Sequence, residues 1–315
     1  MNTVLLAGAG QLGSRHLQGL KKANAELDIW VFDLSKEALA VAEERYNQVE
    51  ETSTKNVHFV QTLEDVPTKI DVVVNATGSK PRAAIVENIL STKSVKYMIL
   101  EKFLFGKLSD YEKIGDILSE KNVKTWVNCP FKLYSGYQQL KKLLDYTSPI
   151  SMTFAGENWG LCCNAIHYID IFMYLSESSD FTLDMSEIEN RVIDSKRPGY
   201  VELLGSLKIR TPKGDCLNLI SKETYDAAYT IVNAGKKYLV SEGENTIKID
   251  DTIMSLGLEY QSNLTGVVVD QLLTQGTCNL STYNLSAGYH KKFLAEVAPF
   301  INKIKGWEND SCPIT

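Results

Sequence analysis

The sequence lacks a surplus of basic residues and has no long apolar run. Its 33 lysines and arginines are outnumbered by 39 aspartates and glutamates, which gives a formal net charge of −6 at pH 7. Without a basic surplus, we expect neither a nucleic acid nor an anionic membrane as a partner. No stretch approaches the roughly 20 apolar residues of a membrane span, and the first residues, MNTVLLAGAG, carry no basic leader. We therefore expect a cytoplasmic protein.

Cysteine is scarce and irregularly spaced. The six cysteines form no CxxC pair, and in a cytoplasmic chain free thiols are usual. The rest of the composition, with 44% hydrophobic and 23% charged residues, is that of a globular protein. A length of 315 residues is more than most single cores hold, so we expect two domains.

Short apolar runs alternate with helical stretches over the first 128 residues. Strands are predicted at 4–7, 29–32, 57–60, 71–75, 97–100 and 124–127. Continuous apolar strands separated by helices are typical of a parallel sheet that is covered on both faces. We therefore predict a doubly wound α/β domain of the Rossmann type over residues 1–128.

A glycine motif, GAGQLG, follows the first strand and opens a helix. Gly8 permits the turn, Gly10 lets backbone N–H groups approach a pyrophosphate, and Gly13 lets the helix pack against the strand. Asp33 ends the second strand, 20 positions after Gly13. A carboxylate there accepts hydrogen bonds from ribose hydroxyls and repels the 2′-phosphate of NADP. The motif predicts a bound dinucleotide, NAD rather than NADP, although nearby Lys36 offsets part of the repulsion.

The pattern changes from about residue 149. A strand at 151–155 and a helix at 164–176 precede strand-like runs at 200–211, 215–222, 227–233 and 236–241, separated by turns such as TPKGD. Such runs indicate an antiparallel meander, and we predict an α+β domain with an open, mainly antiparallel sheet over residues 129–315. Residues 252–275 and 288–305 are predicted to be helical. Because one sheet face lacks a cover, we expect a homodimer or homotetramer built on residues 200–241.

Ligands of such parallel sheets bind beyond the carboxyl ends of the strands. The segments at these ends are Ala76-Thr77-Gly78, Glu101-Lys102 and residues 128–131, and we expect a cleft between the domains there. In the second domain, the segment WGLCCNAIHYID at 159–170 places Cys163, Asn164 and Asp170 within one helical turn of His167. Four interpretations are weighed for this segment: core packing, an active site, a zinc site, for which no fourth ligand is evident, and a redox pair of Cys162 and Cys163, which adjacent positions in a helix disfavour.

These motifs resemble the glucose–fructose oxidoreductase and inositol dehydrogenase (Gfo/Idh/MocA) family, over essentially the whole chain. The resemblance is carried by GAGQLGSRH at 8–16, NATG at 75–78, EKF at 101–103, VNCPF at 127–131 and WGLCCNAIHYID at 159–170. It implies an NAD(P)-dependent enzyme that oxidises or reduces a hydroxyl or carbonyl group on a sugar, an inositol or a related molecule. It also implies a Rossmann domain joined to an open-faced sheet domain that often pairs subunits.

The resemblance assigns roles to individual residues. Lys102 matches the lysine of the family's Glu-Lys-Pro motif, with Phe103 in place of the proline, so we expect no cis peptide bond at this position. His167 matches the catalytic histidine, Cys163 replaces the aspartate four positions earlier, and Asp170 matches a common acidic position. The expected cofactor contacts are Gly8, Gly10, Gln11, Leu12, Gly13, Asp33, Ala76, Thr77, Gly78, Glu101 and Lys102.

The implied chemistry is hydride transfer to or from the nicotinamide. Lys102 would stabilise the developing alkoxide and His167 would accept the hydroxyl proton, with Cys163 and Asn164 as its neighbours. The form of segment 159–170 favours a sugar, sugar nucleotide or polyol substrate in bacterial surface-carbohydrate biosynthesis. Two alternatives remain: a non-catalytic sugar or NAD sensor on the same fold, and a reductase of a non-sugar carbonyl or a tetrapyrrole. No metal is expected.

Overall fold

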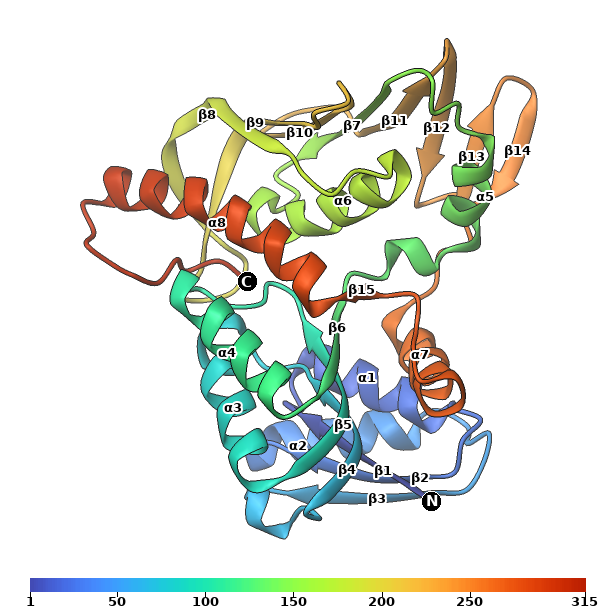
Figure 1. Ribbon diagram of the computed structural model, residues 1–315, viewed down its shortest axis with the longest axis vertical. Coiled ribbons are helices and arrows are strands. Elements are labelled where there is room, and N and C mark those ends of the chain that lie inside the picture. The colour runs from blue at the N-terminus through green and yellow to red at the C-terminus, as the bar shows by residue number, and fades with distance from the viewer. The chain divides into compact units, whose positions relative to one another are not determined.

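The computed structural model describes all 315 residues, which form two compact units (Figure 1). The first unit holds Met1–Phe105, Ser109–Asn128 and Glu259–Asn284, and the second holds Gly106–Leu108, Cys129–Leu258 and Leu285–Thr315. The units are therefore not the two consecutive stretches, 1–128 and 129–315, that we expected. Residues 259–284 join the first unit because α7 (Gln261–Gln275) packs on α1 (Gln11–Lys21). At this contact a Cβ on Gly266 would lie 2.4 Å from the carbonyl oxygen of Gly19.

The first unit is built on a seven-stranded sheet in the order β15-β6-β5-β4-β1-β2-β3. Its parallel strands are β1 (Asn2–Ala7), β2 (Leu27–Phe32), β3 (Lys55–Val60), β4 (Lys69–Asn75), β5 (Ser94–Glu101) and β6 (Lys124–Asn128). Only β15 (Ser281–Thr282) is antiparallel. The central strands are buried and rich in branched apolar residues, which is typical of a sheet covered on both faces. The predicted Rossmann fold is confirmed.

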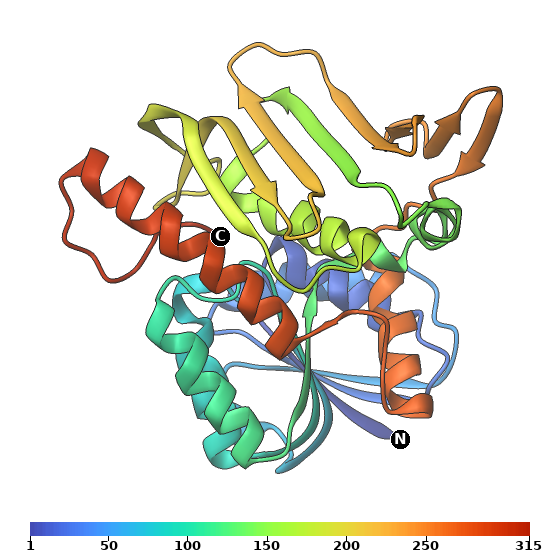
Figure 2. The ribbon, with the colours of Figure 1, turned by 45° about the horizontal axis from the view of Figure 1, so that its top comes forward.

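Helices connect these strands. Besides α1 and α7, they are α2 (Lys36–Asn47), α3 (Ser79–Thr92) and α4 (Leu108–Glu120), with a 3₁₀ turn, η1, at Leu63–Asp65. Figures 1 and 2 show α3 and α4 side by side, and Lys113 on α4 pairs with Glu87 on α3 at 2.7 Å. Because β1, β2, β4 and β5 run parallel, their carboxyl ends lie at the same edge of the sheet.

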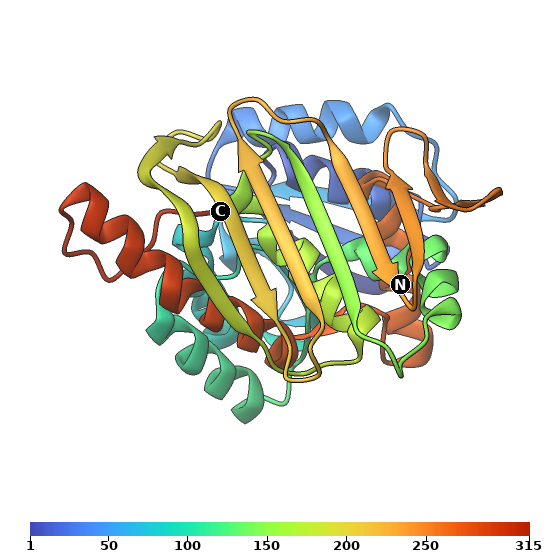
Figure 3. The same ribbon diagram turned by 90° about the horizontal axis from the view of Figure 1, so that it is seen from above.

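The second unit is built on an eight-stranded sheet, seen from above in Figure 3, in the order β14-β13-β12-β11-β7-β10-β9-β8. The strands are β7 (Ile150–Glu157), β8 (Thr182–Asp194), β9 (Val201–Arg210), β10 (Cys216–Lys222), β11 (Ala228–Asn233), β12 (Lys236–Ser241), β13 (Thr246–Ile249) and β14 (Thr252–Ser255). The sheet is mainly antiparallel, as predicted. The meander is interrupted, however, because β7 lies between β10 and β11 and runs parallel to β10.

One face of this sheet is covered by α6 (Leu161–Ser176), as Figures 2 and 3 show. The unit also contains η2 (Pro130–Leu133), α5 (Ser135–Leu143) and α8 (Tyr283–Lys305), whose first two residues cluster with the first unit. The prediction of helix from residue 252 was wrong, since 252–255 form β14. The strand β8 was missed because its sequence, TLDMSEIENRVID, is polar and forms an exposed edge.

The face of the sheet that α6 does not cover carries both polar and apolar side chains. Ser151 and Thr153 of β7 and Asn218 of β10 share this face with exposed Val232 and Leu239. None of the helices in the protein combines the length and apolar character that crossing a membrane takes. All six cysteines are free thiols.

Candidate functional site

The glycine loop after β1 is tightly packed from one side and open on the other. Gly8 has a φ of +95°, and a Cβ there would lie 3.0 Å from the backbone nitrogen of Thr77. A Cβ on Gly13 would lie only 1.9 Å from the carbonyl oxygen of Gly8, whereas a Cβ on Gly10 would meet no atom within 4 Å. Exposed Gln11 and half-buried Leu12 open α1 here, and the first N–H groups of a helix attract anions.

Asp33 lies beside this loop at the end of β2. Its Oδ2 accepts a hydrogen bond from the backbone N–H of Ala9 at 2.7 Å, and its Oδ1 accepts one from Ser35 at 2.9 Å. The next side chain, Leu34, is 77% exposed. A carboxylate fixed beside the glycine loop and followed by an exposed apolar side chain fits the adenosine half of a dinucleotide.

The loop after β4 packs against the same glycine. Asn75 Oδ1 accepts hydrogen bonds from the backbone N–H and the hydroxyl of Thr77, at 3.2 and 2.6 Å. The Nδ2 group of Asn75 is buried and has no partner in the protein, and such groups usually bond to a ligand or water. Ala76, Thr77 and Gly78 are half-buried. The loop therefore also fits a bound dinucleotide.

Glu101, at the end of β5, lies in a buried network within the first unit. Its carboxylate accepts a hydrogen bond from Asn128 Nδ2 and lies 2.9 Å from His16 Nε2, while His16 Nδ1 lies 2.9 Å from the hydroxyl of Thr265. Burial by itself would raise the pKa of Glu101, but hydrogen bonds from His16 and Asn128 and the charge of Arg82 hold the pKa below its ordinary value. Its carboxylate thus faces protein partners, and a cofactor contact for it stays a prediction.

No role was predicted for His16 from the sequence. The sequence did offer a signal for a role of His16, because this residue lies in the helix that follows the glycine motif, in the segment GAGQLGSRH. Its side chain is 1% exposed, and only the folded chain brings it to Glu101, 85 positions away.

Lys102 is half-exposed and follows directly on this network. The Lys102–Phe103 peptide bond is cis, so our expectation of a trans bond was wrong. The tertiary surroundings decide the conformation here: Phe103 is fully buried, and Arg82 of α3 donates hydrogen bonds to the carbonyl groups of Phe103 and Leu104. Arg82, five positions after Thr77, was not among the residues predicted from the sequence.

In the second unit, the first turn of α6 is held by Glu202 of β9. The Glu202 carboxylate, 5% exposed, accepts hydrogen bonds from the backbone N–H groups of Cys162 at 2.7 Å and Cys163 at 3.1 Å. A carboxylate at this position complements the positive end of the helix. Asn164 Nδ2 donates to the carbonyl of Trp159 at 2.9 Å. The bonds of Glu202 and Asn164 together fix the start of segment 159–170. Glu202 was not among the residues predicted from the sequence.

His167 is half-buried one turn further along α6. Its ring stacks on Phe131, with centroids 5.2 Å apart and an angle of 23° between the planes. Phe131 also contacts the ring of Tyr168, whose pKa is raised by burial. Asp170 is 2% exposed; burial and then the charge of Asp170 raise the pKa of Tyr289 on α8. Asp170 is therefore set toward α8 and the core of the second unit.

The two neighbouring cysteines lie in different surroundings. Cys162 is 1% exposed and burial raises its pKa, which fits the core-packing interpretation for this thiol. Cys163 is half-buried and lies in the lining of a cavity. No three His, Cys, Asp or Glu side chains are grouped so that they could hold a metal ion, so the zinc interpretation gains no support.

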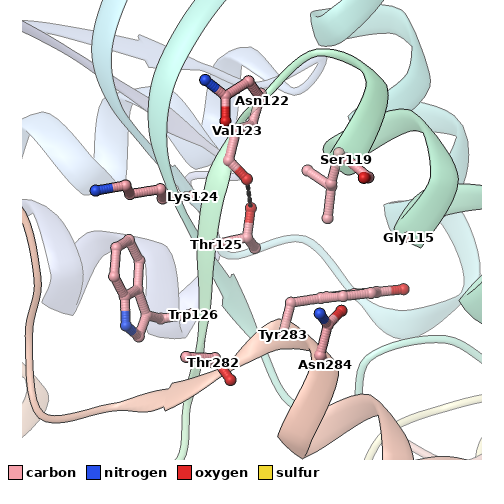
Figure 4. Close-up of a pocket in the computed structure, with 11 residues that line it drawn as sticks. Gly115, Ser119, Asn122, Val123, Lys124, Thr125, Trp126, Thr282, Tyr283 and Asn284 are labelled. Atoms are coloured by element: carbon pink, nitrogen blue, oxygen red, sulfur yellow. Dashed lines mark hydrogen bonds between the residues drawn. The ribbon is translucent and has the colours of Figure 1, made fainter.

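Two cavities lie near these elements. One, of about 220 Å³, opens at the start of α6 and is lined by Asn158, Trp159, Gly160, Cys163, Asn164, Asp194, Ser195, Lys196, Arg197 and Glu202. The other, of about 360 Å³, lies in the first unit along β6 (Figure 4). Tyr283 lies beside Gly115 of α4 there (Figure 4), and its hydroxyl donates to the carbonyl of Tyr111 in the first turn of α4 at 2.7 Å. None of the predicted site residues lines this second cavity.

Comparison with known proteins agrees with this geometry. Residues 2–129 match the model of the family described as "Oxidoreductase family, NAD-binding Rossmann fold" (GFO_IDH_MocA). No curated protein matches the chain. The structure of UDP-N-acetylglucosamine 3-dehydrogenase GnnA from Acidithiobacillus ferrooxidans is similar, with a TM-score of 0.70 at 13% identity, covering 97% of this chain and 98% of that one.

Two further solved structures share the fold. Biliverdin reductase from Synechocystis sp. PCC 6803, in complex with biliverdin and NADP⁺, has a TM-score of 0.68 at 16% identity and covers 97% of this chain and 99% of its own. A super-repressor mutant of Gal80p from Saccharomyces cerevisiae has a TM-score of 0.71 at 13% identity and covers 96% of both chains. The resemblance predicted from the sequence is confirmed over residues 2–129, which match the oxidoreductase family with an NAD-binding Rossmann fold.

Proposed function

We propose that the protein is an NAD(P)-dependent dehydrogenase or reductase in which the nicotinamide exchanges a hydride with a hydroxyl or carbonyl carbon of a sugar, sugar nucleotide or related polyol. The observation that carries this proposal is the glycine loop. Gly8 and Gly13 are packed against protein backbone, Gly10 is open, and Asp33 is fixed beside the loop by its bond to Ala9. We further propose that it works in the cytoplasm, where thiols stay reduced.

The cofactor contacts in this proposal come from three segments. Backbone N–H groups from Gly10 to Gly13 hold the pyrophosphate at the start of α1. Asp33 accepts hydrogen bonds from the ribose hydroxyls, which favours NAD over NADP. The loop 76–78 and Lys102 hold the nicotinamide half.

Two side chains carry the proton chemistry in this proposal. Lys102, as an ammonium, holds the substrate oxygen and stabilises the negative charge that develops on it. His167 accepts the proton that leaves the hydroxyl, or returns it in the reverse direction. Cys163 and Asn164 orient His167 from the preceding turn of α6, and Asp170 supports that helix from the core.

The substrate class rests on the residues of the second unit. Half-buried Trp159, whose Nε1 donates to the carbonyl of Ile220 at 2.8 Å, is fixed beside Asn158, Asn164 and charged side chains of the α6 cavity. A fixed aromatic face surrounded by amide and charged groups suits a molecule with many hydroxyls. The likeness to a sugar-nucleotide dehydrogenase and the form of segment 159–170 favour bacterial surface-carbohydrate biosynthesis.

The test is incubation of the protein with NAD⁺ or NADP⁺ and a panel of sugars, inositols and UDP- or CMP-sugars, followed by the absorbance of the reduced cofactor. Turnover of at least one member that is lost in Lys102→Ala supports the proposal. Turnover that persists in Lys102→Ala and His167→Ala would assign the chemistry to other residues.

The same panel separates the alternatives. The biliverdin reductase likeness makes biliverdin with NADPH the first non-sugar probe, and reduction of biliverdin alone would favour a tetrapyrrole reductase. The Gal80p likeness keeps the sensor alternative open. A sensor would bind NAD(H) tightly and turn over nothing in the panel.

We also propose a homodimer or homotetramer formed through the face of the second sheet that α6 does not cover. Val232 is 37% and Leu239 45% exposed on this face, and burial of exposed apolar area drives association. Light scattering at micromolar concentration should give at least twice the monomer mass, and Leu239→Glu should reduce it. A monomer in the unchanged protein would refute this proposal.

A further inference from the structure

Buried side chains of the first unit hold the backbone on both sides of Lys102. On the preceding side, Glu101 is anchored by His16 of α1 and Asn128 of β6. On the following side, Arg82 of α3 donates to the carbonyl groups of Phe103 and Leu104. The half-exposed Lys102 thus lies between residues that are bonded on both sides to buried side chains of the first unit.

Arg82 also bonds to a third carbonyl group, which lies in a different loop. Its guanidinium also donates a hydrogen bond to the carbonyl of Thr77, in the loop that follows β4. The side chain is 1% exposed and is one of the largest fully buried side chains of the protein. A buried charge is costly unless it is well bonded, so the position of this guanidinium is set by the carbonyl groups around it.

The loop at Thr77 in turn packs on the glycine loop. The missing Cβ of Gly8 would lie 3.0 Å from both the backbone nitrogen and Cγ2 of Thr77. A ligand seated on the glycine loop therefore presses on a backbone segment that shares one guanidinium with residues 103 and 104.

We infer that Arg82 is a positioning residue that couples the occupied dinucleotide loop to the segment carrying Lys102. This inference rests on the proposed function, because it takes the ligand of the glycine loop to be NAD(P)(H). Ordering of Thr77 by the ligand fixes the Arg82 guanidinium, and the guanidinium fixes the carbonyl groups of Phe103 and Leu104. Lys102 is then held more closely when the cofactor is bound than when the loop is empty.

The chemistry of arginine suits this role. Its planar guanidinium offers five N–H donors in a fixed fork, so one group can bond to several carbonyl oxygens in different directions. Lysine in this place keeps the charge but offers a single nitrogen on a flexible stem. Glutamine keeps one N–H₂ group and loses the charge. Arg82→Lys and Arg82→Gln therefore remove the bridge to different degrees.

The test is hydrogen exchange of backbone amides, read by mass spectrometry, with and without NADH or NADPH. Wild type, Arg82→Lys and Arg82→Gln are compared over peptides covering residues 8–14, 76–82 and 101–106. The matched control is Arg45→Gln in the same unit: Arg45 donates to Ser14, inside peptide 8–14, but has no bond to the carbonyl groups of Thr77, Phe103 or Leu104, so its loss leaves the bridge in place. Thermal unfolding of each variant establishes that it is folded.

In the wild type and in Arg45→Gln, the cofactor should slow exchange in all three peptides. In Arg82→Gln, protection of 8–14 should remain while protection of 101–106 falls on the order of tenfold, with a smaller loss in Arg82→Lys. Retained protection of 101–106 in both variants, or its absence in the wild type despite protection of 8–14, would overturn the coupling. Absence of protection at 8–14 in the wild type, with both cofactors, would instead overturn the proposed function and the inference with it.

Discussion

Replacing Gly13 by alanine tests the glycine loop most directly. The new methyl carbon would lie 1.9 Å from the carbonyl oxygen of Gly8 and 2.8 Å from its carbonyl carbon. Both are backbone atoms, so no side chain can rotate away to relieve the overlap. An ordinary contact of about 3.5 Å requires α1 and β1 to separate by about 1.6 Å at this point.

The cost of that separation follows from the packing on both sides. Val4 to Ala7 of β1 and Leu17 of α1 are fully buried, and well-packed interiors have no spare volume for a shift. Overpacking of such a core costs about 1–3 kcal/mol, and more when backbone must move. We therefore expect Gly13→Ala to lower the free energy of unfolding by about 3 kcal/mol or more.

Gly10→Ala is the matched control. Its Cβ would meet no atom within 4 Å, and its φ of −62° and ψ of −164° are open to alanine. Removing a glycine that adopts such a conformation stabilises a protein by about 0.4–1 kcal/mol through the unfolded chain. The methyl group would nevertheless project where we propose the pyrophosphate approaches the backbone. We expect normal stability and an NADH affinity that is lower by about tenfold or more.

Two measurements decide the outcome. Urea unfolding followed by circular dichroism gives the free energy of unfolding, and titration of NADH fluorescence gives the affinity. Gly13→Ala with the stability of the wild type would show that the close packing of α1 on β1 is not as described. Wild-type NADH affinity in Gly10→Ala would place the pyrophosphate elsewhere.

The remaining predictions concern four charged or titratable residues. Asp33→Ala should narrow the preference for NADH over NADPH, measured by calorimetry; an unchanged preference would contradict the role of Asp33. Lys102→Ala should reduce turnover by about 10²–10³ and His167→Ala by about 10²–10⁴. NADH affinity should change little in either variant, because neither residue touches the adenosine half, where Asp33 and the glycine loop stay intact. Glu101 has a lowered pKa, so its charge stabilises the fold above the unfolded-state pKa, and this stabilisation is lost as the pH falls through the folded-state pKa. The destabilisation by Glu101→Gln in urea unfolding should therefore be constant from about pH 7 to about pH 5 and shrink as the pH falls below the ordinary glutamate pKa of about 4.3; a difference that stays constant down to about pH 3 would refute this.

Local pattern was enough to predict the six parallel strands of the first unit. The strands β1 to β6 are short apolar runs, and most of them are separated by helices, which is typical of a parallel sheet. The glycine spacing predicted a turn at Gly8 and close packing at Gly13, because both depend on neighbours within the same βαβ unit. The position of Asp33 followed from the same unit.

Contacts between distant segments were out of reach. The pairing of His16 with Glu101 joins residues 85 positions apart, and the capping of α6 by Glu202 joins residues 40 positions apart. No local periodicity marks such partners, since a buried polar side chain reads in the sequence like any solvated one. The insertion of β7 between β10 and β11 likewise depends on which strand edges pair on folding, and the local sequence does not specify this pairing.

By itself, the sequence determined the Rossmann fold, the dinucleotide motif and the presence of a second, mainly antiparallel sheet, because each rests on periodicity or on residue types within a few tens of positions. Only the tertiary structure decided that residues 259–284 join the first unit, that the Lys102–Phe103 bond is cis, and that Arg82 bridges two loops. The physical reason is the same in each case. Buried hydrogen-bonding groups and close-packed surfaces must find partners, and those partners come from parts of the chain that meet only on folding.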